Sequence, residues 1–93
     1  MSTSLERKWY AAVASLENCV SCGEFGVQVS HSNQGRGMGQ KAPPWETAAL
    51  CPREHYEVDN GKEMSQLERR AFHDRMIVRT HSALIRAGKL KLV

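Results

Sequence analysis

The sequence predicts a small α+β domain, in which an N-terminal helix and a long C-terminal helix flank a centre of two short strands and a helix. Three observations predict this class. Hydrophobic residues recur at helical spacing near both ends of the chain. The centre carries all three prolines and two short β-prone runs. The spacing of the three cysteines, finally, indicates a metal site in that centre.

Length and charge limit the functions that the chain can have. The 93 residues form one domain, residues 1–93, and a chain this short gains needed stability from a structural metal. An odd number of cysteines, no apolar signal segment and no membrane-spanning run together indicate a reducing cytoplasm and no membrane partner. The net charge of +3 suits nucleic acid as a partner but does not prove one.

The N-terminal helix is expected within residues 1–17. Thr3 and Glu6 have the spacing of a capping box, in which each side chain bonds to the other residue's backbone N–H. Hydrophobic residues then recur at helical spacing at Leu5, Trp9, Ala12, Val13 and Leu16. A short amphipathic helix is therefore predicted here.

The central unit is expected within residues 18–61. Residues 25–30 and 47–50 are rich in β-prone side chains and predict two short strands, separated by a long loop. Pro52 is acceptable in the first turn of a helix, so a helix is expected over residues 53–59, until an Asn-Gly pair stops it.

The longest helix is expected within residues 64–88, where Ser65 and Glu68 form a second capping-box pattern. Its apolar side is predicted at Leu67, Ala71, Phe72, Met76, Ala83, Leu84 and Ala87. We expect that side to pack in the core, with an arginine-lined groove as the second interpretation. His73 and His81 are interpreted as surface histidines on an arginine-rich face.

The cysteines predict a zinc site. Cys19 and Cys22 have the C-x2-C spacing of a zinc knuckle, and a glycine follows them. Cys51 supplies a third thiol, and either Glu54 or His55 must complete the tetrahedron. The alternative is that Cys51 is a buried small hydrophobic residue.

Histidine and carboxylate side chains in the centre suit hydrolysis of a phosphodiester. His31 can act as the base that deprotonates water, although a hydrogen-bonded structural histidine is the simpler interpretation. His55 and Asp59 are four residues apart on the predicted helix and can face one harder cation, although Asp59 can equally be a solvated helix-end residue. Between these groups, a glycine-rich loop with Arg36 and Lys41 suits phosphate contacts, or else is a flexible linker.

The order of these motifs resembles that of the HNH or ββα-metal endonucleases, and within them most closely the small phage and prophage nuclease family typified by YbcO. The resemblance covers nearly the whole chain. It rests on Cys19-x2-Cys22-Gly, Val29-Ser-His31, Gly37-Met-Gly-Gln-Lys41-Ala-Pro-Pro-Trp-Glu46 and Ala49-Leu-Cys51-x2-Glu-His55-x3-Asp59. Glu54 departs from the family, which has its fourth cysteine at that place.

The resemblance implies a small HNH-like domain braced by zinc, with an N-terminal helix and a long C-terminal helix. It makes His31 the general base or metal-activating histidine, His55 the ligand of a catalytic Mg²⁺ or Mn²⁺, and Glu46 and Asp59 the acidic residues of the site. The structural Zn²⁺ would be held by Cys19, Cys22 and Cys51, with His55 or Glu54 as the fourth ligand. Arg36, Lys41, Arg53 and Arg69 are the residues expected to contact nucleic acid.

Two hypotheses follow for the function. The first is a metal-dependent phage or prophage endonuclease that hydrolyses nucleic acid in the cytoplasm of a bacterial host, with DNA favoured over RNA. The second is a catalytically degenerate HNH-like zinc module that binds nucleic acid or a protein without cleaving. Glu54 favours the second, whereas the presence of His31, His55 and Asp59 together favours the first. The sequence leaves the substrate's strandedness and the oligomeric state open.

Overall fold

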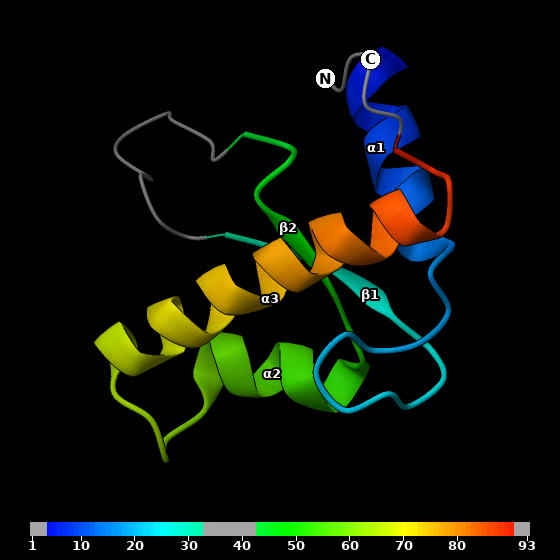
Figure 1. The fold of residues 1–93 in the computed structure, drawn as a ribbon. Coiled ribbons are helices and arrows are strands. Elements are labelled where there is room, and N and C mark those ends of the chain that lie inside the picture. The colour runs from blue at the N-terminus through cyan, green and yellow to red at the C-terminus, as the bar shows by residue number, and fades with distance from the viewer. Residues whose placement is uncertain (1–3, 33–42, 91–93) are drawn as a thin grey trace.

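The computed structural model describes residues 4–32 and 43–90. Within them lie three helices and one two-stranded antiparallel sheet, which confirms the predicted α+β class (Figure 1). The elements follow in the order α1 (Ser4–Ala14), β1 (Gln28–His31), β2 (Thr47–Leu50), α2 (Pro52–Asn60) and α3 (Gln66–Arg86). No helix in this part of the chain is both long and apolar enough to cross a membrane.

The two strands pair with Gln28 opposite Leu50 and His31 opposite Thr47. β2 coincides with the run predicted for it, but β1 begins three residues later than the predicted run. The reason lies at Phe25, which pairs with Asn18 in an isolated β-bridge. The start of the β-prone run therefore closes a small hairpin around the first two cysteines, and only its end joins the sheet.

The second strand forms the centre of the core, because every residue of β2 is buried. Successive side chains of a strand point to opposite faces. Ala48 and Leu50 accordingly join one hydrophobic cluster, with Met76 and Ile77 of α3. Ala49 joins a second cluster, with Val13 of α1 and Leu84 of α3.

On the edge of β2 away from β1, the backbone groups of Ala49 also form hydrogen bonds. The backbone N–H of Ala49 donates to Oγ1 of Thr80, 3.1 Å away, and the Ala49 carbonyl accepts from the N–H of Val20 at 3.0 Å. The Thr80 hydroxyl in turn donates to the carbonyl of Met76 at 2.8 Å. Because Thr80 belongs to α3, its bond to Ala49 ties the long helix to the sheet, which the helix crosses in Figure 1.

The long helix starts at the predicted capping box: Ser65 accepts from the Glu68 N–H, and the Glu68 carboxylate accepts from the Ser65 N–H. Its buried face differs from the prediction, since the Leu67 side chain is 76% exposed. The side chains buried on α3 are His73, Met76, Ile77, Thr80 and Leu84, whose spacing places them on one face of the helix. Interpreting His73 as a surface histidine was therefore wrong.

The short helix α2 starts immediately after the third cysteine. Cys51 is its N-cap with an extended backbone, and Pro52 occupies the first helical turn, as predicted. The helix ends where the N–H of Gly61 donates to the carbonyl of Glu57 at 2.9 Å. A Cβ on Gly61 would lie 2.4 Å from that carbonyl oxygen, so the tight end of α2 requires glycine.

Candidate metal centre and adjoining pocket

The hairpin around the first two cysteines brings three sulfur atoms together. The N–H of Cys19 donates to the Glu24 carbonyl and the N–H of Gly23 donates to the Cys19 carbonyl, each at 2.9 Å. Gly23 has a left-handed backbone, with φ of 79°. Cys51 approaches from the end of β2, so the Sγ atoms of Cys19, Cys22 and Cys51 lie within 4.8 Å of one another. We call these three residues the cysteine cluster; all are free thiols.

The surroundings of the cysteine cluster favour a thiolate at one position and oppose it at another. Burial raises the pKa of the Cys19 thiol, but backbone N–H groups of Cys22, Cys51 and Ser21 outweigh burial and bring the pKa below its usual value. The N–H of Glu24 lowers the pKa of Cys22, but burial and the thiols of Cys19 and Cys51 outweigh that bond and raise it. A soft divalent cation would bind all three sulfur atoms as thiolates and offset their negative charges. The donor set therefore fits Zn²⁺.

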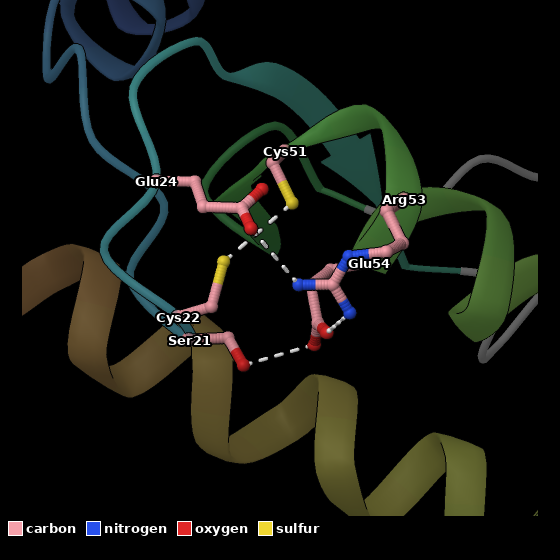
Figure 2. A network of polar contacts seen from close by, with 6 residues as sticks. All are labelled: Ser21, Cys22, Glu24, Cys51, Arg53 and Glu54. Atoms are coloured by element: carbon pink, nitrogen blue, oxygen red, sulfur yellow. Dashed lines mark hydrogen bonds and ion pairs between the residues drawn. The ribbon is translucent and has the colours of Figure 1, made fainter.

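Charged side chains lie beside Cys22 and Cys51 of the cysteine cluster, as Figure 2 shows. The guanidinium of Arg53 lies 3.5 Å from a carboxylate oxygen of Glu24 and 3.1 Å from one of Glu54. The other oxygen of Glu54 accepts from the hydroxyl of Ser21 at 2.9 Å. The carboxylates of Glu24 and Glu54 raise the pKa of the Arg53 guanidinium, and the nearby Cys22 and Cys51 raise it further.

His55 belongs to a different group of contacts. Its Nδ1 donates to the side-chain oxygen of Gln28 in β1 at 2.8 Å, and its Nε2 lies 3.4 Å from Oδ2 of Asp59. The structure thus places the two candidates for the fourth zinc ligand in separate surroundings: Glu54 beside the hairpin of the cysteines, and His55 between β1 and the end of α2.

A pocket of about 100 Å³ lies among β1, α2 and α3. The polar side chains that line it include His31, Asp59, Gln66, Arg69, Arg70 and His73. Arg69 donates from Nη1 to the Asp59 carbonyl at 3.1 Å, while its Nε is buried and has no hydrogen-bond partner in the described part of the chain. A buried donor of this kind, on a cationic side chain, suits an anion. We call this cavity the His31 pocket.

His73 is the most buried of the polar residues of the His31 pocket that sequence reasoning missed, the others being Ser32, Gln66 and Arg70. Its side chain is 3% exposed, and its Nε2 lies 2.9 Å from Oγ and 3.2 Å from the carbonyl oxygen of Ser30. Burial lowers its pKa, which keeps the imidazole neutral, although Asp59 and Asp74 act in the opposite direction. The signal in the sequence was its spacing from Met76, Ile77 and Thr80, which places all four residues on one face.

The remaining predicted residues are spread around the sheet. The ring of His31 makes an edge contact with Tyr10 of α1, with centroids 5.3 Å apart. The carbonyl of Glu46 accepts from the N–H of Ser32 at 3.0 Å, so its backbone lies beside the end of β1. Arg36 and Lys41 lie outside the described residues, as does the glycine-rich loop that contains them.

Among the residues that the structure describes, the cysteine cluster is the one group of three or more His, Cys, Asp or Glu residues whose ligand atoms converge as a metal requires. His31, His55 and Asp59 do not form a second such group there, although Asp59 pairs with His55 and shares the His31 pocket with His31. No family model, curated protein or solved structure matches the chain.

Proposed function

We propose that the protein is a metal-dependent endonuclease of the ββα-metal kind, which hydrolyses phosphodiester bonds in nucleic acid, preferentially DNA. The supporting observation is the position of Asp59, which contacts His55 and lines the same pocket as His31. Residues of β1 and α2 thus line one pocket together with two arginines of α3. The setting implied by the resemblance, a phage or prophage protein in a bacterial cytoplasm, is part of the proposal.

His55 and Asp59 are the residues that would hold the catalytic cation. Because Gln28 offers an oxygen to Nδ1, the proton of a neutral His55 resides there, and Nε2 presents a lone pair beside Asp59. These two donor atoms lie 3.4 Å apart, close enough to bind one cation together. Bound Mg²⁺ or Mn²⁺ would supply a Lewis acid for the scissile phosphate.

His31 is the proposed general base. It ends β1, its side chain is exposed, and it lines the pocket in which a phosphate would lie. An imidazole that titrates near neutral pH can accept the proton of an attacking water molecule. Arg69 and Arg70 would bind the phosphate oxygens, since guanidinium groups donate in pairs to such oxygens.

A second candidate function is binding of nucleic acid or a protein without cleavage. Two observations favour it: Glu54 replaces the fourth cysteine of the resembled family, and His31, His55 and Asp59 do not converge as a ready metal site. In that case the His31 pocket would hold a backbone phosphate, and the cysteine cluster would only brace the fold.

A cleavage assay separates the two functions. Purified protein is incubated with single-stranded, duplex and branched DNA and with RNA, in Mg²⁺ or Mn²⁺. We expect nicking of DNA, loss of nicking in His31→Ala, and retention in His81→Ala, whose imidazole donates to the Trp45 carbonyl outside the pocket. Substrates left intact in every divalent ion, but bound in a gel-shift assay, would establish the binding module instead.

A further inference from the structure

The cysteine cluster supplies three ligands, whereas structural zinc sites in proteins bind four. The fourth position must therefore be taken by another side chain or by solvent. Helix α2 offers two candidates next to each other, Glu54 and His55. Consecutive residues of an α-helix point about 100° apart, so at most one of them faces the sulfur atoms. The contacts of the two side chains decide which one does.

His55 does not face the cysteine cluster. Both nitrogens of its ring contact groups outside the cluster, since Nδ1 donates to Gln28 at 2.8 Å and Nε2 lies 3.4 Å from Asp59. Binding a metal at the cluster would require the imidazole to give up both contacts. Glu54 and His55 lie three and four residues after Cys51, so spacing alone does not separate them. The Glu54 carboxylate, by contrast with His55, accepts from the hydroxyl of Ser21 at 2.9 Å, within the hairpin of the cysteines.

We propose that the carboxylate of Glu54 is the fourth ligand of a zinc centre at the cysteine cluster, and that Ser21 and Arg53 are the positioning residues that orient it. The Glu54 side chain is only 18% exposed, and it accepts from Ser21, which lies in the hairpin between Cys19 and Cys22. Figure 2 shows Glu54, Ser21 and Arg53 gathered around Cys22 and Cys51. This inference does not depend on the proposed nuclease activity.

The lone pairs and the charges allow this arrangement. A carboxylate has about four lone-pair positions, and Ser21 and Arg53 engage one on each oxygen, so a position stays open for a metal. Zinc with three thiolates and a carboxylate has a net charge of −2, by the sum of formal charges. Arg53, which lies close to the thiols of Cys22 and Cys51, offsets part of it.

Two measurements test the proposal: zinc affinity by competition with a chelator, and the visible spectrum of the Co²⁺-substituted protein. We expect Glu54→Gln to weaken zinc binding at least about tenfold. Glu54→Cys should bind zinc more tightly than the natural protein, and should raise the thiolate-to-cobalt absorption by about a third, because a fourth sulfur joins the metal. His55→Gln should leave the spectrum unchanged.

Glu24→Gln is the matched control, since it removes a carboxylate that faces the same guanidinium of Arg53 and leaves Glu54 in place. The Glu24 side chain is 59% exposed, so we expect zinc affinity to change less than about fivefold. Unchanged affinity and spectrum in Glu54→Gln would overturn the proposal, as would a loss confined to His55→Gln. If Glu54→Gln does not fold, the Co²⁺ spectrum of Glu54→Cys tests the proposal instead. A thiolate-to-cobalt absorption no stronger than that of the natural protein would show that residue 54 does not bind the metal.

Discussion

The imidazole Nε2 of His73 lies 2.9 Å from the hydroxyl oxygen of Ser30, the residue directly before His31 in β1. The same nitrogen also lies 3.2 Å from the Ser30 carbonyl oxygen, which can only accept, so Nε2 carries the proton. A buried side chain of α3 thus holds the end of the strand that presents His31. The position of the proposed base therefore depends on a residue 42 positions later in the chain.

The buried His73 makes stability depend on pH. Burial lowers its pKa in the folded protein, so the unfolded chain, where the pKa is about 6.5, takes up the proton more readily. The stability contributed by neutral His73 is complete above pH 6.5 and decreases as the pH falls toward the lower, folded-state pKa. We expect the advantage of the natural protein over His73→Gln in unfolding free energy to shrink between pH 7 and pH 5, by at most about 1.4 kcal/mol per pH unit.

Urea unfolding of the natural protein and of His73→Gln at each pH measures the difference in their unfolding free energies. Ionisable groups that both proteins share contribute equally to the two values, so their titration cancels in the difference. Besides burial and the hydrogen bond to Ser30 of β1, the titratable groups that influence the pKa of His73 are Asp59 and His55 from α2 and Asp74 from α3 itself. A free-energy difference that stays constant from pH 7 to pH 5 would contradict the prediction.

Thr80 is predicted to stabilise the fold through its hydroxyl group. Thr80→Val keeps the shape of this fully buried side chain but leaves the N–H of Ala49 without its acceptor. We expect a loss of about 1–3 kcal/mol in unfolding free energy, measured by urea denaturation. Thr80→Ser retains the hydroxyl, and should protect the amide hydrogen of Ala49 from exchange better than Thr80→Val does. Equal exchange rates in the two variants would count against this role.

Removal of zinc is predicted to destabilise the whole domain, because Cys19 and Cys51 are buried within the first hydrophobic cluster. A strong chelator should lower the melting temperature by more than about 10 °C, and added Zn²⁺ should restore it where Mg²⁺ does not. Circular dichroism during heating gives the measurement. A melting curve that is the same with and without chelator would show that the cysteine cluster is not a structural metal site.

The arginines of the His31 pocket are predicted to bind phosphate. Arg69→Gln and Arg70→Gln should each weaken DNA binding, and should reduce the slope of log affinity against log salt concentration by about 0.9. Arg86→Gln, at the other end of α3, removes the same charge outside the pocket and serves as the control. Equal losses in all three variants would indicate general electrostatic attraction rather than a phosphate site.

Local patterns in the sequence predicted much of the fold. Pro52 after Cys51 placed the start of α2, and Ser65 with Glu68 placed the start of α3, because caps and prolines act on the backbone within a few residues. The spacing of Cys19 and Cys22 likewise predicted a group of thiols that Cys51 joins. Each of these features is determined by neighbours along the chain or by a short hairpin.

Features that depend on distant partners were not predictable in the same way. His73 looked like a surface residue because arginines surround it in sequence, and its hydrogen-bond partner Ser30, 43 residues away, could not be identified from the local pattern. Arg53, expected to contact nucleic acid, forms ion pairs with Glu24 and Glu54. The position of Arg53 in the sequence, two residues after Cys51, gives no indication that Glu24 of the hairpin lies beside its guanidinium. Such contacts become visible only once the sheet and helices are packed.

The hydrogen bonds of Ala49 to Thr80 and Val20 also affect how copies of the chain can meet. A strand with free backbone groups along one side is a template for adding a strand from another molecule, and this is a common first step toward aggregation or domain swapping. An incoming strand along β2 would meet an N–H and a carbonyl at Ala49 that are already bonded within the molecule. Intermolecular strand addition there must first displace α3 from the sheet, which gives even this very small sheet a barrier to polymerisation.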